Sequence, residues 1–228
     1  MQKVSIIIPV YNEKKTLEEI IARVEAAPVL GLDKEIVLVD DGSTDGTKDI
    51  LRKFETKHRV VYHQKNQGKG AALRTGFKEA TGDIILIQDA DFEYDPQEFP
   101  KLLQPILDGK ADIVYGSRNL QRNPRFRRSY YWGSIIISRL TNLFYGCHLT
   151  DVYTCYKAFK APILKAMKLE SNSFDIEEEM TAKALKSGHK IIEVPINYYP
   201  RNIQEGKKIR PKDGLIALWK IAKYRVGP

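Results

Sequence analysis

Val4-Ser-Ile-Ile-Ile-Pro-Val10 and Glu35-Ile-Val-Leu-Val-Asp40 are the two stretches that decide the fold class of this chain. Each is a short, nearly continuous apolar run, which is typical of a strand buried on both faces of a parallel sheet. Between the runs, apolar residues recur with helical spacing at Leu17, Ile20, Ile21 and Val24. Together the three segments predict a β-α-β unit.

The alternation of strand and helix continues along the first half of the chain. Apolar patterns predict helices at 50–54 and 71–80, and strands at 59–63, 83–88 and 111–116. Asp95-Pro-Gln-Glu98 supplies a carboxylate cap, a proline and a first-turn glutamate, so a helix is expected to begin there and to end before Gly109. This order predicts an α/β fold with an open, mostly parallel sheet flanked by helices. Such sheets bind ligands at the carboxyl ends of their strands.

The second half of the chain opens with an arginine-rich loop that contains Arg122, Arg125, Arg127 and Arg128. Helical spacing follows at 132–144, a further helix at 174–187 is ended by Gly188, and a last strand is expected at 191–198. We expect one domain over residues 1–203. A basic mobile loop and a C-terminal amphipathic helix are expected over residues 204–228.

Composition places the chain among globular proteins with an anionic partner. Of its 228 residues, 43% are hydrophobic and 29% charged, which excludes disordered and fibrous classes. The net charge of +8 is compatible with nucleic acid, a lipid headgroup or a phosphorylated small molecule. No run reaches the roughly 20 apolar residues that span a bilayer. Cys147 and Cys155 show no zinc spacing and follow no signal peptide, so a cytoplasmic location with reduced thiols is expected.

The most informative local motif is Gln88-Asp-Ala-Asp91, which ends a predicted buried strand. Alternation along an extended segment lets Asp89 and Asp91 point the same way. Magnesium and manganese prefer such oxygen ligands and commonly bridge to substrate phosphates. Taken alone, the two aspartates fit a solvated turn about as well.

Acidic and aromatic residues also follow the first two predicted strands. Asp40 and Asp41 belong to Val39-Asp-Asp-Gly-Ser-Thr-Asp45, and Tyr11 and Glu13 to Pro9-Val-Tyr-Asn-Glu13. A carboxylate at this edge can accept from a base N–H or a ribose hydroxyl, and a tyrosine can stack on a base. Alone, the Asp-Asp-Gly-Ser stretch is more often a loop and helix cap. The three strand ends are expected to converge.

A glycine-rich stretch, Asn66-Gln-Gly-Lys-Gly-Ala-Ala72, opens a predicted helix. Backbone N–H groups near Gly68 and the ammonium of Lys69 are suited to phosphate oxygens. The stretch has neither the P-loop spacing nor a dinucleotide fingerprint, so it is supporting evidence only.

The order of these motifs, with Gly116-Ser-Arg118 after them, resembles the inverting family 2 glycosyltransferases over nearly the whole chain. This resemblance implies a Rossmann-like nucleotide-diphospho-sugar transferase (GT-A) fold. Glu193-Val-Pro-Ile-Asn-Tyr-Tyr-Pro-Arg201 and Glu205-Gly-Lys-Lys-Ile209 resemble the polyisoprenyl-phosphate branch, which includes dolichol-phosphate mannose and glucose synthases.

The resemblance implies roles for individual residues. Asp89 and Asp91 engage a Mg²⁺ or Mn²⁺ ion and the donor diphosphate. Glu93 stands where mannose synthase relatives carry a glutamine near the metal, which leaves its role as a third ligand open. Arg118, Arg201 and one of Arg127 and Arg128 match positions around the donor diphosphate and the acceptor phosphate. The nucleotide-sugar site is expected to contain Pro9, Tyr11, Asn12, Glu13, Asp40, Asp41, Gly68, Lys69, Gln88 and Ala90.

The implied reaction moves a hexose from a GDP- or UDP-linked donor to a polyprenyl or dolichyl phosphate. A phosphate monoester has a second pKa near 6, so the acceptor is mostly ionised at neutral pH and needs no general base. Glu177, Glu178 and Glu179 therefore receive no role, and a solvated helix face is the simpler expectation for them.

Attachment to lipid is expected to involve the C-terminal segment. Branch members often carry transmembrane helices after the catalytic domain, whereas this chain ends at Pro228. Leu215, Leu218, Trp219 and Ala222 form an apolar stripe beside Lys220, Lys223 and Arg225. Such a helix can lie on an anionic membrane at the cytoplasmic face, or it can pack on the core with its lysines reaching water.

Two other functions remain as alternatives. A soluble glycosyltransferase that acts on a glycan hydroxyl needs a carboxylate base, for which Asp151 and the glutamates at 177–179 are the candidates. A nucleic-acid-binding module would use the loop at 118–128, but the acidic strand ends beside it would repel phosphate, so no nucleic-acid partner is expected. The oligomeric state is not predicted.

Overall fold

The computed structural model describes residues 2–124, 128–201 and 211–226. In this part of the chain, a seven-stranded sheet has the strand order β3-β2-β1-β4-β6-β5-β7. The strands are β1 (Lys3–Val10), β2 (Asp33–Asp40), β3 (Arg59–Tyr62), β4 (Ile84–Ile87), β5 (Ile113–Ser117), β6 (Lys157–Lys160) and β7 (Ile191–Pro195).

The expected mostly parallel sheet is confirmed. Strands β3, β2, β1 and β4 run parallel to one another, and β5 runs parallel to β7. Strand β6 lies antiparallel between β4 and β5 and joins the two parallel groups. Neither β6 nor the short helix after it was predicted.

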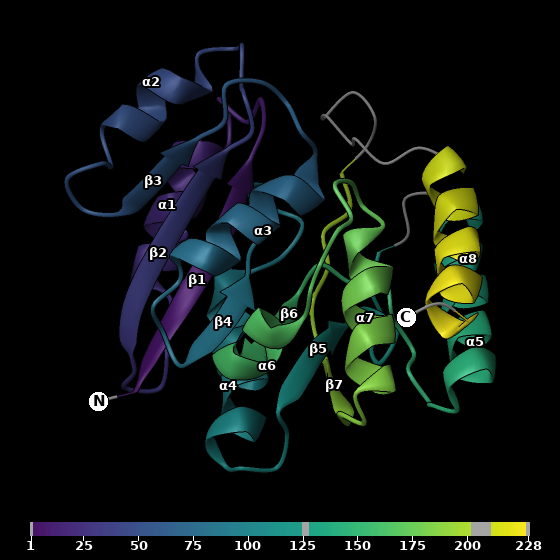
Figure 1. The fold of residues 1–228 in the computed structure, drawn as a ribbon. Coiled ribbons are helices and arrows are strands. Elements are labelled where there is room, and N and C mark those ends of the chain that lie inside the picture. Colours follow the sequence, from purple (N-terminus) through teal and green to yellow (C-terminus); the bar gives the residue numbers. More distant parts are fainter. Residues whose placement is uncertain (1, 125–127, 202–210, 227–228) are drawn as a thin grey trace.

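The helices cover both faces of the sheet (Figure 1). They are α1 (Leu17–Ala26), α2 (Thr47–Arg52), α3 (Lys69–Glu79), α4 (Phe99–Leu107), α5 (Arg128–Tyr145), α6 (Ala161–Ala166), α7 (Ile176–Lys186) and α8 (Pro211–Val226). Ile6 and Ile8 of β1 pack with α1 and α4, and Ile7 packs on the other face with α3, α6 and α7. Because side chains alternate along a strand, the apolar run of β1 is buried on both sides, as predicted.

Two helix ends follow their predicted signals, whereas the helix expected at 50–54 begins earlier and spans Thr47–Arg52. Asp95 accepts a bond from Gln97 N at 3.0 Å and caps a 3₁₀ turn (Pro96–Glu98) that leads into α4. Gly188 follows α7 with a φ of 78°, which favours glycine. Of the helices that the structure describes, none has the length and apolar character required to cross a bilayer.

Helices α5 and α8 form a pair outside α7 (Figure 1). The hydroxyl of Tyr145 in α5 donates to Ile221 O in α8 at 3.1 Å. Ile137, Tyr153 and Ile221 are buried between these elements. Helix α8 therefore packs on the domain through Ile221 and Tyr224, while Trp219 and Ala222 of the predicted apolar stripe face outward. The division of the chain at residue 203 stays a prediction.

Candidate active site

The predicted convergence of three strand ends at one sheet edge is confirmed. Strand β1 lies between β2 and β4, and all three run in the same direction. The segments that follow β1 and β4 are joined by a bond from Thr16 Oγ1 to Ala90 O at 2.9 Å. Residues 11–13, 40–41 and 88–91 therefore lie together at the carboxyl ends of the strands, where open α/β sheets bind ligands.

Asp89 is paired with a lysine from the start of α3. The ammonium of Lys69 lies 2.7 Å from Asp89 Oδ1 and contacts Cys155 Sγ at 2.9 Å. Burial disfavours the ionised carboxylate, but the charge and hydrogen bond of Lys69 outweigh it and lower the pKa of Asp89. Asp89 is thus held as an anion.

Asp91 is paired with an arginine from beyond the last strand. Arg201 donates from Nη2 to Asp91 Oδ2 and from Nη1 to both oxygens of Glu13, at 3.2 Å each. Burial and the neighbouring charge of Asp89 raise the pKa of Asp91 to about 7 in spite of Arg201. Ionising Asp91 beside Asp89 is therefore unfavourable, and a further positive charge at this place would favour it.

This donor set fits the expected Mg²⁺ or Mn²⁺ ion. Magnesium is commonly held by one or two carboxylates, and substrate phosphates and water complete its coordination. Asp89 and Asp91 meet that requirement, and a divalent cation would relieve the repulsion between them. In the described residues, no group of three or more His, Cys, Asp or Glu side chains forms a complete metal site.

Glu93, the third metal ligand considered, is directed toward the segment that carries Arg201. Glu93 Oε1 accepts Arg201 N at 2.7 Å, and Oε2 accepts the hydroxyl of Tyr198 at 3.0 Å. Its own backbone N–H donates to Asp91 Oδ1 at 2.9 Å. The structure thus places Glu93 beside Asp91 but engages both of its carboxylate oxygens elsewhere.

Asp40 and Asp41 shape the loops at this edge. Asp40 accepts the backbone N–H groups of Gly42 and Ser43 at 3.2 to 3.3 Å. Asp41 accepts Gly68 N at 2.7 Å, Gln67 N at 2.9 Å and His63 Nδ1 at 2.8 Å. Both carboxylates are buried, so a nucleotide that contacts either one must share an oxygen that already accepts bonds.

The glycine-rich stretch packs against its own chain. Gly68 has a φ of 101°, and a Cβ there would lie 2.2 Å from Asn172 O. A Cβ at Gly70 would lie 2.4 Å from Ser171 O. These two glycines are therefore required by the segment at 171–173. The N–H of Gly68 is already donated to Asp41, and phosphate binding by Lys69 stays a prediction.

The remaining residues predicted to bind the nucleotide lie around the acidic cluster, which is the group Glu13, Asp89, Asp91 and Glu93. Pro9 pairs with Val39 in the sheet, and Tyr11 is half-buried just beyond β1. Asn12 has a φ of 51°, and its Oδ1 accepts Thr44 N at 2.8 Å. Gln88 is buried and accepts the hydroxyl of Tyr156 at 2.9 Å. Their roles in nucleotide binding stay predictions.

Residues 5–167 match the sequence model of the family described as Glycosyl transferase family 2. The chain belongs to this family. It is 34% identical over 212 residues to a dolichol-phosphate mannosyltransferase of Pyrococcus furiosus, across 90% of this chain and 59% of the relative. It is 29% identical to an undecaprenyl-phosphate mannosyltransferase of Micrococcus luteus, across 99% of both chains. The predicted resemblance to the polyisoprenyl-phosphate branch is confirmed.

Solved structures confirm the expected GT-A fold. Glucosyl-3-phosphoglycerate synthase from Mycobacterium tuberculosis, in complex with phosphoglyceric acid, superposes with a TM-score of 0.77 and 22% identity, over 100% of this chain and 81% of that one. The same enzyme with Mn²⁺, UDP and glucosyl-3-phosphoglycerate gives a TM-score of 0.74 at 23% identity, over 98% of this chain and 80% of that one.

The predicted arginines of this glycosyltransferase differ in how they are held. Arg118 donates from Nε and Nη2 to the two oxygens of buried Asp151, at 2.7 Å each, and its guanidinium lies 5.1 Å from the ring centre of Tyr198. Arg118 is thus fixed by an internal ion pair, and its contact with phosphate stays a prediction. Arg127 and the side chain of Arg128 lie outside the described part of the structure.

The prediction that the glutamates at 177–179 form a solvated face is wrong, because all three are buried. Glu177 is 2.5 Å from Lys157 Nζ and 3.7 Å from Lys69 Nζ. Glu179 accepts the N–H groups of Glu170 and Ser171. Each carboxylate faces a different partner around α7, so the helix end is held inside the domain.

Other parts of the site were not predicted. Tyr94 stacks on Tyr156, with 4.9 Å between the ring centres, and packs at a tilt of 53° against Tyr198 at 5.3 Å, whose hydroxyl donates to Glu93. Lys69 links Asp89 to Glu177 on α7. The residue types were visible in the sequence, but only the tertiary fold brings these elements together.

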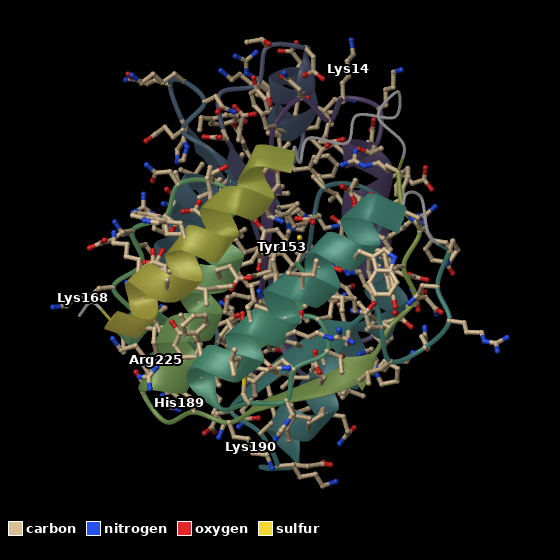
Figure 2. The ribbon with its side chains drawn as sticks, turned by 90° about the vertical axis from the view of Figure 1, so that its right-hand side faces the viewer. Lys14, Tyr153, Lys168, His189, Lys190 and Arg225 are labelled. Carbon is tan, nitrogen blue, oxygen red and sulfur yellow. The ribbon has the colours of Figure 1, made fainter. Side chains whose placement is uncertain are left out.

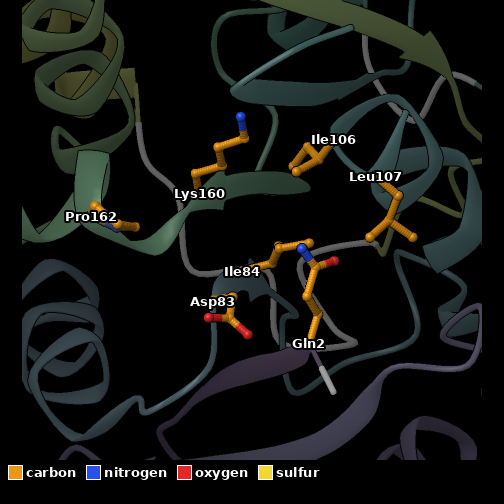
Figure 3. A pocket seen from close by; sticks show the side chains of 7 residues that line it. All are labelled: Gln2, Asp83, Ile84, Ile106, Leu107, Lys160 and Pro162. Carbon is orange, nitrogen blue, oxygen red and sulfur yellow. The ribbon is translucent and has the colours of Figure 1, made fainter. Parts of the chain in front are cut away.

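One pocket of this glycosyltransferase lies away from the acidic edge (Figure 3). Gln2, Asp83 and Ile84 line it at the amino ends of β1 and β4, together with Ile106 and Lys160. Its charged groups are already paired, since Asp83 accepts Lys3 N and Lys160 contacts Asp112. In the described part of the chain, the pocket therefore offers no unpaired charged group for a phosphate-containing ligand, and the strand-end site is the better candidate for the active site.

Proposed function

We propose that this chain moves a hexose from a GDP- or UDP-linked donor to the phosphate of a polyprenyl or dolichyl phosphate, with inversion at the anomeric carbon. The observation that carries the proposal is the pair of half-buried Asp89 and buried Asp91 after β4, with Lys69 and Arg201 directed at it. This arrangement combines metal ligands with cations for two phosphate-containing substrates. The names of the Pyrococcus and Micrococcus relatives support a lipid-phosphate acceptor.

On the donor side, Asp89 and Asp91 would hold Mg²⁺ or Mn²⁺. When bound, the metal supplies positive charge to the departing diphosphate. The Mycobacterium structure with Mn²⁺ and UDP supports this requirement. Lys69 has its ammonium 2.7 Å from Asp89 Oδ1, and in this proposal it would bind a phosphate oxygen of the donor.

On the acceptor side, Arg201 would orient the attacking phosphate. Its Nε is buried and has no hydrogen-bond partner among the described residues, so one donor of the planar fork is left to pair when a phosphate displaces the present contacts. A phosphate oxygen attacks the anomeric carbon while the bond from that carbon to the diphosphate oxygen breaks. Attack from the face opposite the leaving group inverts the configuration, and the ionised acceptor has no proton to lose.

The lipid part of the acceptor suggests membrane docking through the α5–α8 pair. Figure 2 shows the two helices facing the viewer. Their apolar surface is made by the exposed residues Trp132, Ile136, Leu143, Phe144, Ile216 and Trp219. Lys220 and Lys223 lie beside the Trp219 ring, at 5.7 and 5.3 Å from its centre. Aromatic residues beside lysines suit an anionic interface, and we place this surface at the cytoplasmic face of a membrane.

The alternative acceptor, a glycan hydroxyl, requires a carboxylate base. The geometry gives it little support, because Asp151 is fully buried with both oxygens bound to Arg118. The glutamates at 177–179 are also buried and directed inward. A phosphate acceptor needs no such base.

The test is a transfer assay with purified protein and Mn²⁺. Radiolabelled UDP-glucose and GDP-mannose are each supplied with undecaprenyl phosphate or with free oligosaccharides. We expect a lipid-extractable labelled product with one of the donors. Label found only in the oligosaccharide fraction would contradict the proposed acceptor.

A further inference from the structure

Glu93 holds the short segment that ends in Arg201. Its carboxylate accepts Arg201 N at 2.7 Å through Oε1 and the Tyr198 hydroxyl at 3.0 Å through Oε2. Its backbone carbonyl accepts Tyr199 N at 2.9 Å. One residue therefore fixes three of the four positions at 198–201.

This segment lacks the support of the sheet, because β7 ends at Pro195. Among the described residues, its other backbone anchors lie before residue 199: Glu98 accepts Asn197 N at 2.7 Å, and Asn123 Oδ1 accepts Tyr198 N at 2.9 Å. In the part of the chain that the structure describes, the backbone of Arg201 is thus held by its bond to Glu93. An arginine side chain gains precision when its backbone is fixed, since less freedom is then left to lose on binding.

The contact of Glu93 with the acidic cluster is made by its backbone. The N–H of Glu93 donates to Asp91 Oδ1 at 2.9 Å, while its carboxylate is directed at residues 198 and 201. Turning that carboxylate toward a metal would break its bonds to the half-buried Arg201 N–H and to the Tyr198 hydroxyl. Losing the partner of a buried donor is unfavourable.

We propose that Glu93 is a positioning residue, which sets Arg201 for the acceptor phosphate, and that it is not a ligand of the metal. The first part of this inference rests on the proposed function, because it assumes that the acceptor is a phosphate; the second part, on the metal, does not. Glutamine at this position keeps an oxygen for Arg201 N and an amide group for the Tyr198 hydroxyl, whereas alanine keeps neither.

The experiment measures two quantities on the same variants. The first is the KM for undecaprenyl phosphate at saturating donor, and the second is the affinity for Mn²⁺ in the presence of UDP or GDP, followed by electron paramagnetic resonance. For Glu93→Ala we expect the acceptor KM to rise about tenfold or more, with the Mn²⁺ dissociation constant unchanged within a factor of about two. Glu93→Gln should restore most of the lost acceptor affinity.

Tyr198→Phe gives a second test that removes one of these bonds and leaves every carboxylate in place. We expect its acceptor KM to rise about threefold, again without change in Mn²⁺ affinity. Tyr62→Phe is the matched control, because the Tyr62 hydroxyl bonds to Glu55 at the far edge of the sheet. That variant should behave as the wild type.

A tenfold loss of Mn²⁺ affinity in Glu93→Ala would overturn the proposal and make Glu93 a metal ligand. An unchanged acceptor KM in both Glu93→Ala and Tyr198→Phe would also overturn it. If wild-type protein fails to use undecaprenyl phosphate with any donor, the proposed function is at fault, and the Mn²⁺ measurement still decides between ligand and non-ligand.

Discussion

Arg201 and Asp91 are 110 positions apart in the sequence, and their side chains form an ion pair at the end of β4. The same guanidinium bonds to Glu13 from the end of β1. A divalent cation that binds Asp91 must therefore compete with Arg201 for the carboxylate. The pairing also brings Arg201 to the place where the donor diphosphate is expected.

This competition predicts that Arg201→Ala binds Mn²⁺ more tightly than wild type when no nucleotide is present. Removing the guanidinium takes away a cation that competes with the metal for Asp91, so we expect a gain in affinity of about tenfold, equivalent to about 1.4 kcal/mol. Titration followed by electron paramagnetic resonance measures it. Arg52→Ala, which removes an exposed arginine that pairs with Asp49, should leave the affinity unchanged. Equal affinities in all three proteins would argue against the competition.

Arg201→Lys is predicted to impair use of the acceptor. Lysine keeps the positive charge but loses the planar fork that matches phosphate oxygens. We expect kcat/KM for the polyprenyl phosphate to fall by one to two orders of magnitude, about 1.4 kcal/mol for each factor of ten, while the donor KM stays nearly constant. Steady-state kinetics at saturating donor provide the measurement. An unaltered acceptor dependence would show that Arg201 has a structural role only.

The raised pKa of the buried Glu178 carboxyl group leads to a prediction on how the stability of the protein depends on pH. Burial raises its pKa to about 8 from a usual 4.5, although Lys157 lies near and Thr141 bonds to it at 3.4 Å. Between these values the folded state holds a proton that the unfolded chain has released. The free energy of unfolding therefore falls as pH rises from about 4.5 to about 8, by at most about 1.4 kcal/mol per pH unit from this group.

Glu178→Gln removes this ionisation. We expect the variant to gain stability relative to wild type as pH is raised from 6 to 8.5 in urea unfolding experiments, with the two proteins converging at lower pH. Glu19→Gln, at an exposed ion pair with Arg23, serves as the control and should follow the wild-type curve. Parallel curves for Glu178→Gln and wild type would exclude the buried protonated carboxylate.

Membrane docking is predicted to depend on the apolar surface of α5 and α8. Leu143 and Trp219 are 77% and 59% exposed, and burying either in lipid contributes on the order of 1.5 to 3 kcal/mol. Leu143→Ser with Trp219→Ser should lower partitioning into phosphatidylglycerol vesicles at least tenfold in a sedimentation assay. Leu30→Ser, at another exposed leucine, should have no effect. Undiminished binding of the double variant would move the membrane contact elsewhere.

The strand ends of the site could be predicted because their signal is local. Apolar runs locate β1, β2 and β4, and the polar residues that follow each run must then meet at the edge of a parallel sheet. The same reasoning failed for α7, where Glu177 is buried by its pairing with Lys157 of β6. The four residues of β6 include two lysines, so they show no apolar pattern from which a buried strand could be predicted.

The internal partners of the arginines were also beyond local reasoning. Arg118 pairs with Asp151 and Arg201 with Asp91, in each case between elements that only the tertiary fold brings together. The resemblance to a family identified both arginines as important. Only the structure shows that Arg118 binds both oxygens of Asp151, whereas Arg201 bonds to Asp91 and Glu13 and keeps a donor with no partner in the described residues.

The most direct test of the central claim is the structure of the reaction product, made by wild type and by Asp91→Ala with undecaprenyl phosphate and Mn²⁺. Removing Asp91 takes away one of the two expected metal ligands, so transfer should fall by at least about two orders of magnitude while the melting temperature shows a folded protein. We predict that wild type forms a sugar phosphodiester of the lipid whose anomeric proton, observed by NMR, has the configuration opposite to that of the donor, and that a chelator stops its formation. A retained configuration, or full activity in chelator or in Asp91→Ala, would contradict the account.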